Sequence, residues 1–161
     1  MEILSFIFTI IASTQTFIIC CLLIALFLLK QKKTREAVFF ISSALGLAVS
    51  VVFFKELFHI PRPEGIDIYT TGYAFPSGHS AGIIFLGIII PFLTRHTATT
   101  IRYAVLILSI LSVIAVGISR VYFNAHTPIQ VIAGYALGAL WAGIFVGIIH
   151  RRVGRLKHSV K

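Results

Sequence analysis

The chain has 161 residues, of which 58% are hydrophobic and 12% are charged, and this balance excludes an ordinary soluble domain, whose apolar share is about half. The net charge of +9 does not indicate a nucleic-acid-binding protein, because the 14 lysines and arginines form no single soluble patch. Long uncharged segments separate these cations, which is typical of an integral membrane protein, and the length fits one domain.

Five uncharged segments predict an all-α fold, an integral membrane bundle of five helices with short connections. They comprise residues 3–29, 37–54, 80–94, 103–119 and 127–149. A helix needs roughly 17–25 residues to cross a bilayer, so the third segment suffices only if its helix begins near Ser77. The polar residues 13–16 interrupt the first segment. It is either one tilted helix or a short interfacial piece followed by a second helix, so the bundle has five or six helices, and whether residues 1–16 span stays open.

Basic residues predict the orientation of these helices. They lie in residues 30–35 after the first segment, at Arg95 and Arg102 after the third, and in the tail, residues 151–161. Alternating helices bring all three groups to one membrane face, which the excess of lysine and arginine makes cytoplasmic. We therefore expect a multi-pass protein of the plasma membrane whose C-terminus is cytoplasmic.

Small residues within the segments predict close packing and no chemistry. Adjacent cysteines on one helix point apart and lack metal-ligand spacing, so Cys20 and Cys21 are expected to be small apolar residues. Glycines four residues apart let helix backbones approach closely in lipid. Two such pairs lie in the last segment, Gly134 with Gly138 and Gly143 with Gly147.

Three cations break the charge pattern, because Lys55, Arg62 and Arg120 fall on the extracytoplasmic face together with His79 and His126. A charged side chain at the edge of hydrocarbon is costly and usually functional. Lysine supplies a point charge, and arginine supplies a planar fork that matches two phosphate oxygens. Together they predict an anion site at the outer membrane surface.

The residues before His79 predict a helix start that also favours an anion. Pro76 closes the external loop, Ser77 suits the position that caps a helix, and Gly78 lets a ligand approach the backbone closely. The free N–H groups of the first turn and the positive end of the helix dipole attract anions independently of side chains.

Two histidines add groups whose charge changes near neutral pH, so His79 and His126 suit proton or phosphoryl transfer. Gln130 follows His126 by four residues and would share its face of a helix. The amide oxygen of Gln130 would then accept the ring N–H and fix one tautomer.

Taken in order, the three polar segments resemble the signature of the type 2 phosphatidic acid phosphatases, which are integral membrane lipid phosphatases. The signature reads Lys55, six residues, Arg62-Pro63; then Pro76-Ser77-Gly78-His79; then Ser119-Arg120, five residues, His126. The resemblance covers roughly residues 37–150 and implies one membrane-embedded domain over residues 1–161. Residues 1–36 would form the first helix and a cytoplasmic loop, residues 37–150 the catalytic core, and residues 151–161 a basic tail.

The resemblance also implies a role for each site residue. His126 would attack phosphorus and become a phosphohistidine, while His79 would protonate the leaving oxygen and afterwards activate water. The phosphoryl oxygens would be held by Lys55, Arg62, Arg120, Ser77 and the backbone N–H of Gly78. No metal ion and no other cofactor is expected, since cations already surround the phosphate.

One position departs from the family, which has an aspartate four residues after the nucleophilic histidine, where this chain has Gln130. An amide orients the ring but brings no full negative charge to it. The enzyme would then be slower, or Glu64 or Asp67 would replace the carboxylate, or the chain would be an altered version. We favour native activity, because the rest of the site is intact.

The function implied is hydrolysis of a lipid phosphate or pyrophosphate at the extracytoplasmic face of a bacterial inner membrane, in envelope biogenesis or lipid metabolism. Candidate substrates are undecaprenyl pyrophosphate, lipid A 1-phosphate and phosphatidylglycerophosphate, and we favour the prenyl or glycolipid pyrophosphates. The same phosphohistidine would serve a lipid phosphotransferase, and Gln130 would fit a non-catalytic lipid-phosphate-binding protein. The expected partners are the lipid substrate and the bilayer, not nucleic acid, and the oligomeric state stays open.

Overall fold

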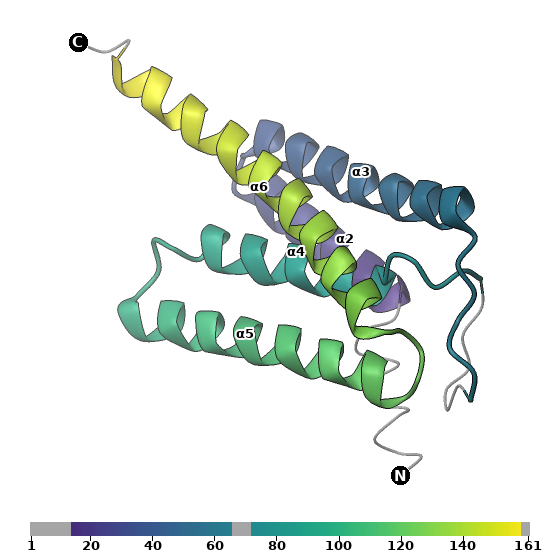
Figure 1. Cartoon of the computed structure of the whole chain (residues 1–161). Helices are drawn as coiled ribbons and strands as arrows, with labels where there is room; N and C mark the ends of the chain where they lie inside the picture. The colour runs from purple at the N-terminus through teal and green to yellow at the C-terminus, as the bar shows by residue number, and fades with distance from the viewer. Residues whose placement is uncertain (1–13, 66–71, 159–161) are drawn as a thin grey trace.

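The computed structural model describes residues 14–65 and 72–158, with side chains described up to Arg151. Its elements are five α-helices, and consecutive helices run in opposite directions (Figure 1). They are α2 (Thr14–Lys30), α3 (Thr34–Phe58), α4 (Gly78–Leu93), α5 (Thr99–Tyr122) and α6 (Pro128–His158). The predicted all-α bundle is confirmed. Whether the segment before Thr14 crosses the membrane lies outside the described residues.

Local signals place two of the helix ends that border the site. The hydroxyl of Ser77 accepts a hydrogen bond from the Ser80 N–H at 3.4 Å, so α4 begins directly after Ser77, as predicted. Helix α3 ends at Phe58, slightly before the predicted end near Ile60. His59 stops it by adopting a left-handed conformation with a φ of 48°.

Three of the described helices, α3, α5 and residues 128–151 of α6, are long and apolar enough to cross a membrane. Helices α2 and α4 are also apolar but have only 17 and 16 residues. Sixteen residues rise about 24 Å, which is less than the hydrocarbon thickness of about 30 Å. Helix α4 by itself is therefore shorter than the hydrocarbon core of a bilayer.

The alternation of the helices gives the bundle two chemically different ends. The basic end carries the cations that were predicted to share one face: Lys30, Arg35, Arg95, Arg102 and Arg151. The site end is formed by the end of α3, the start of α4, the end of α5 and the start of α6. Helix α6 continues past the other helices at the basic end (Figure 1).

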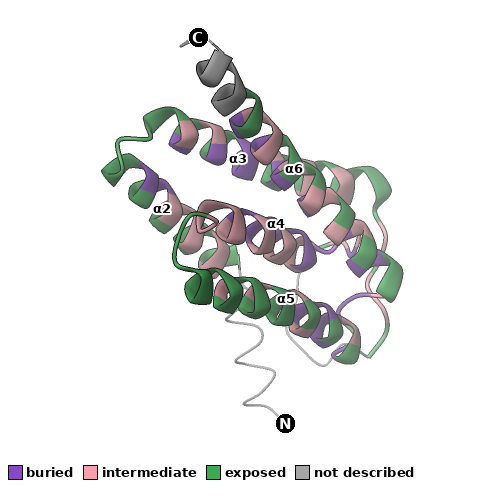
Figure 2. Cartoon of the chain, turned by 90° about the vertical axis from the view of Figure 1, so that its left-hand side faces the viewer, coloured by how far each residue is buried: buried purple, intermediate pink, exposed green. Residues whose placement is uncertain are grey.

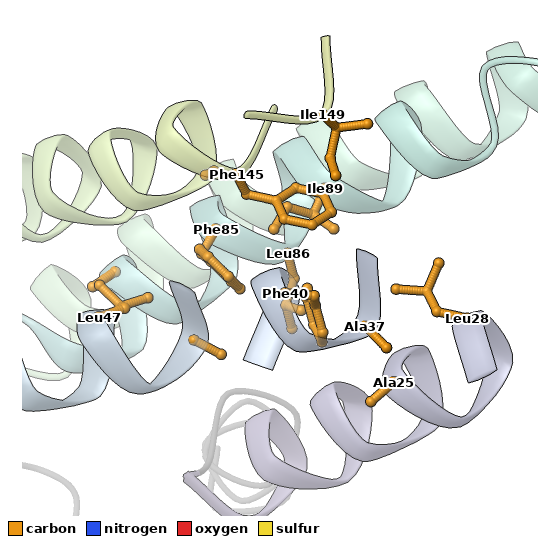
Figure 3. Packing of buried hydrophobic residues seen from close by; sticks show 13 residues of the cluster. Ala25, Leu28, Ala37, Phe40, Leu47, Phe85, Leu86, Ile89, Phe145 and Ile149 are labelled. Carbon is orange, nitrogen blue, oxygen red and sulfur yellow. The ribbon is translucent and has the colours of Figure 1, made fainter. Parts of the chain in front are cut away.

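Helix α4 lies at the centre of the hydrophobic core and packs most extensively on α6 and α5. Phe85 of α4 stacks on Phe40 of α3, with ring centroids 6.0 Å apart, and Phe40 meets Phe145 of α6 edge-on at the same distance (Figure 3). All three rings are fully buried. Such pairs stabilise by about 0.5–1.5 kcal/mol beyond the area they bury, so they join α3, α4 and α6 into one frame.

Glycines set the approach of α6 to α4. A methyl group added at Gly134 would collide with the Ser77 carbonyl, and one at Gly138 would collide with the Ala81 carbonyl, so the close approach predicted for this pair is confirmed. The same prediction is wrong for Gly143 and Gly147, whose added methyl groups would meet no atom within 4 Å. Five residues turn a helix by about 500°, so Gly143 faces away from the contact that Gly138 makes.

Helix α5 is the least buried of the described helices beside the site (Figure 2). Its buried residues are confined to the turns at the site end, and they are Val116, Gly117, Ser119 and Arg120. Within the described residues, α5 makes its substantial contacts with α4 and α6 only. A space therefore remains between α5 on one side and α2 and α3 on the other.

Candidate active site

The segments at the site end bring the predicted cations and imidazoles together. Lys55 lies in the last turn of α3, Arg62 in the loop that follows, and Arg120 in the last turn of α5. All three lie near enough to the His79 ring to act on it electrostatically, and Lys55 and Arg62 act on His126 in the same way. Residues far apart in the sequence thus surround one small volume.

This volume is the charged end of a cavity of about 1040 Å³ between α2, α3, α4 and α5. The charged end is lined by Lys55, Arg62, Gly78, His79 and His126. The remaining wall is mainly apolar, and along α4 it reaches as far as Ile90. Eleven residues separate Ile90 from His79, which corresponds to about 16 Å along the helix. A single cavity therefore joins a cationic site to a long hydrophobic channel.

The start of α4 presents its backbone, not its serine hydroxyl, to this cavity. Ser77 is fully buried, and its hydroxyl oxygen lies 2.9 Å from the hydroxyl of Ser80 in addition to capping the helix. Gly78 and His79 line the cavity, whereas Ser77 is not among the described residues that do. The N–H groups at the start of α4 are therefore the better-placed donors for an anion, and the predicted contact of Ser77 with phosphate stays a prediction.

His126 is 3% exposed, and both of its ring nitrogens have partners. Nδ1 lies 2.8 Å from the Ala74 carbonyl oxygen and 3.3 Å from Oε1 of Gln130. Nε2 lies 3.3 Å from Nη1 of Arg62. A carbonyl oxygen only accepts and a guanidinium only donates, so Nδ1 carries the proton and Nε2 keeps its lone pair.

The surroundings also keep the His126 ring uncharged. Burial, followed by the charges of Arg62 and Lys55, lowers the pKa of His126 from its ordinary 6.5 to about 3, although the bonds to Gln130 and Ala74 act in the opposite sense. Burial also lowers the pKa of Arg62, but a guanidinium still remains charged at neutral pH. A neutral imidazole nitrogen thus lies beside a permanent cation.

Gln130 lies beside His126, as its spacing predicted, but it also serves two other groups. Its side-chain Oε1 accepts a hydrogen bond from the Thr127 N–H at 3.0 Å, at the start of α6. Its backbone carbonyl accepts the Ser77 N–H at 3.1 Å. Gln130, which is 4% exposed, therefore joins the first turns of α4 and α6.

Arg120 has the least satisfied side chain of the site. It is fully buried, and its Nε donates to the Ser119 hydroxyl at 3.3 Å. Nη1 and Nη2 are also buried, yet neither has a hydrogen-bond partner within the described residues. A buried charge without an acceptor is costly. Two free donors on one planar group match two oxygens of a phosphate, which would remove that cost.

Backbone carbonyls of residues 72–74 are site groups that the sequence analysis missed. Arg62 Nε donates to Gly72 at 3.0 Å, Lys55 Nζ donates to Tyr73, and His126 Nδ1 donates to Ala74. Arg62 also reaches the Ala125 carbonyl at 3.0 Å through Nη1. Backbone groups have no residue signature, and the glycine at position 72, with a φ of 71°, marks only a turn.

Of the two carboxylates considered as substitutes for an aspartate, only Glu64 lies within the described residues. Glu64 is exposed and has no hydrogen bond or ion pair with His126 among the described residues, and the prediction for Asp67 lies outside those residues. Across those residues, no three histidine, cysteine or acidic side chains come together as metal ligands. The arrangement instead offers cations, N–H donors and an imidazole lone pair.

Comparisons with known proteins identify the family of the chain. The family model of the PAP2 superfamily matches residues 35–153, which include every predicted site residue. Over 91 residues the chain is 36% identical to phosphatidylglycerophosphatase B of Bacillus subtilis (strain 168); the match covers 53% of this chain and 44% of that protein, so it spans less than half of this relative.

A solved structure is also similar to the whole bundle. It is the crystal structure of a transmembrane PAP2-type phosphatidylglycerolphosphate phosphatase from Bacillus subtilis, with a TM-score of 0.82. The match covers 92% of this chain and 76% of that chain, at 22% sequence identity. At this identity the likeness shows a shared fold.

Proposed function

Because the chain belongs to the PAP2 superfamily, we propose that it is a membrane lipid phosphatase that hydrolyses a lipid phosphate or pyrophosphate through a phosphohistidine. The observation that carries this proposal is Arg120, whose two buried terminal nitrogens have no acceptor within the described residues. A phosphoryl group supplies such acceptors. Arg120 is not among the described residues that line the cavity, but its charge acts on His79, which lines the cavity together with Lys55, Arg62 and Gly78, so a phosphoryl group at the charged end would lie near all three cations.

The shape of the cavity supports a lipid substrate. With its phosphate at the charged end, a lipid would lay its hydrocarbon chains along the apolar wall between His79 and Ile90. Since α5 makes no substantial contact with α2 or α3 within the described residues, longer chains would continue between these helices into the bilayer. A water-soluble phosphate ester would leave this wall unused.

The first chemical step would form the phosphohistidine. The Nε2 lone pair of His126 attacks phosphorus, and the bond from phosphorus to the leaving oxygen breaks while the new N–P bond forms. His79 gives its proton to the leaving oxygen, so the lipid departs as a neutral alcohol, or as a monophosphate if the substrate is a pyrophosphate. Lys55, Arg62 and Arg120 offset the negative charge on the phosphoryl oxygens.

The second step would release phosphate. His79, now a neutral imidazole, takes a proton from water, and the water oxygen attacks phosphorus as the N–P bond breaks. Inorganic phosphate leaves, and Nε2 of His126 recovers its lone pair. Nδ1 keeps its proton in both steps, so the ring needs no change of tautomer.

The name of the curated relative makes phosphatidylglycerophosphate the first substrate to assay, ahead of the pyrophosphates favoured by sequence. Undecaprenyl pyrophosphate and lipid A 1-phosphate follow. The positive-inside rule puts the basic end in the cytoplasm, so the active site would open on the outer face of the inner membrane. The C-terminus would then be cytoplasmic.

The test is release of inorganic phosphate by the full-length protein in detergent, from each of these three lipids and with no acceptor added. We expect release from at least one lipid, and far slower release from glycerol phosphate, which has no hydrocarbon chain. Release without an acceptor separates a hydrolase from a phosphotransferase. No release from any of the three lipids would contradict the proposal.

A further inference from the structure

Three consecutive backbone carbonyls bind three different side chains of the site. We call residues 72–74 the carbonyl strap. Its carbonyls accept hydrogen bonds from Arg62, Lys55 and His126 in turn. The strap is itself fixed, because the Ala74 N–H donates to the Ile60 carbonyl at 2.8 Å. Ala74 is fully buried, so water does not compete for this pairing.

Two acceptors face Nδ1 of His126, and they are not equivalent. The Ala74 carbonyl lies at 2.8 Å, which is a short and normal hydrogen-bond length, whereas Oε1 of Gln130 lies at 3.3 Å. Oε1 also accepts the Thr127 N–H at 3.0 Å, so its interaction with the ring is shared. The main partner of the ring N–H is therefore a backbone carbonyl.

We propose that the Ala74 carbonyl is the group that positions the nucleophilic ring, in the place of the carboxylate that the family pattern puts at position 130; this inference rests on the proposed function. Gln130 then acts mainly at the start of α6, where it holds the Thr127 N–H. The carbonyl fixes the tautomer and the direction of Nε2 without bringing a charge.

The strap also couples the nucleophile to the cations. Because Gly72 and Tyr73 hold Arg62 and Lys55, a shift of this short segment moves both cations and the ring together. Nε2 of His126, which lies 3.3 Å from Nη1 of Arg62, is then held in a fixed position relative to the groups proposed to bind the phosphoryl oxygens. Three hydrogen bonds to three successive residues therefore link the positions of both cations and the ring.

The first test reads the tautomer without any turnover. Nitrogen-15 NMR of the histidine-labelled protein in detergent distinguishes an Nδ1–H ring from an Nε2–H ring, and the His126→Gln variant assigns the signal among the six histidines. We expect the Nδ1–H form in the wild type and also in Gln130→Met, which removes the amide oxygen but keeps the side-chain shape. An Nε2–H ring in either protein would overturn the inference.

The second test weakens the Ala74 carbonyl itself. An ester in place of the amide between Ala74 and Phe75 makes this carbonyl a poorer acceptor, and the lost Phe75 N–H donates no hydrogen bond within the described residues. The ester is introduced by a suppressor tRNA charged with the hydroxy acid of phenylalanine, and the same tRNA charged with phenylalanine gives the matched control.

The inference predicts the order of the effects on kcat. One neutral hydrogen bond corresponds to roughly a tenfold change at most, so Gln130→Met should lose less than about tenfold. The ester should lose more than Gln130→Met, with KM nearly unchanged. The reverse order would overturn the inference. A wild type that is inactive on every lipid would instead refute the proposed function, and the tautomer measurement would still decide the role of the strap.

Discussion

Replacing Arg120 by methionine separates the role of this side chain in anion binding from any role in folding. Arg120 is fully buried, and two of its nitrogens lack acceptors within the described residues. Methionine fills most of the space of the aliphatic stem and carries no charge. We therefore expect a protein that is much less active than the wild type but at least as stable when no anion is present.

The magnitudes follow from the two unsatisfied nitrogens. Each buried donor without a partner costs about 1–3 kcal/mol, so the substitution removes a penalty of roughly 2–6 kcal/mol and loses one bond from Nε to the Ser119 hydroxyl, at 3.3 Å. In contrast, the loss of a preorganised donor that faces the reacting oxygens lowers kcat by roughly 10²–10³. Stability and activity should thus change in opposite directions.

The assay pairs phosphate release with the thermal unfolding midpoint, each measured with and without orthovanadate as a phosphate mimic. A ligand at 100 times its Kd stabilises by about 2.7 kcal/mol, so vanadate should raise the midpoint of the wild type and not that of Arg120→Met. Arg102→Met is the matched control, because Arg102 is exposed at the basic end, and it should change neither quantity. An Arg120→Met protein that is less stable and still responds to vanadate would refute this reasoning.

Three further predictions concern the nucleophile and the packing beneath it. His126→Ala should stay folded but form no acid-labile phosphoenzyme and release no phosphate. Phosphate release by this variant would show that His126 is not the nucleophile. Folding lowers the pKa of His126 from 6.5 to about 3, so as the pH falls the ring takes up a proton in the unfolded chain before it does so in the folded protein. The contribution of the neutral ring to the free energy of unfolding is therefore fully present above pH 6.5 and is lost as the pH falls towards 3. Between pH 6.5 and 3, the unfolding midpoint of the wild type should therefore fall more steeply than that of His126→Ala. Parallel curves would contradict the lowered pKa of His126. Gly134→Val should push α6 away from the Ser77 carbonyl, lower the free energy of unfolding by about 1–3 kcal/mol and lower activity. Gly143→Val is the matched control, because Gly143 has open space around it, and it should change neither stability nor activity. Equal losses in the two variants would mean that the contact of Gly134 with Ser77 is not the cause.

The helices could be predicted from the sequence because their signals are local. Uncharged length predicts a membrane helix, and a serine before a glycine predicts where α4 begins, as Ser77 shows. The direction that each residue faces was harder to predict. Gly138 and Gly143 have the same residue type in the same helix, yet only Gly138 lies against a backbone, because the partner of a helix face is set by the tertiary fold.

The candidate site likewise has residues that the sequence could identify and contacts that it could not. Side chains with distinct chemistry, such as Arg120 and His126, could be identified from residue type and membrane depth alone. The contact that holds the His126 ring most closely comes from the Ala74 carbonyl, and every residue has such a carbonyl. Gln130 was predicted beside the ring, but its bond to Thr127 depends on how α6 begins, which spacing alone does not determine.

The cavity has a cationic end and an apolar wall, and this arrangement has a consequence for turnover. Hydrocarbon chains that move from the bilayer to an apolar protein wall pass between two environments of similar polarity, so this transfer contributes little binding free energy. Under the proposed function, discrimination between the lipid before and after cleavage would therefore depend mainly on the three cations Lys55, Arg62 and Arg120. The lipid product would lack the phosphate that these cations bind, and it would return to the bilayer without a separate release mechanism.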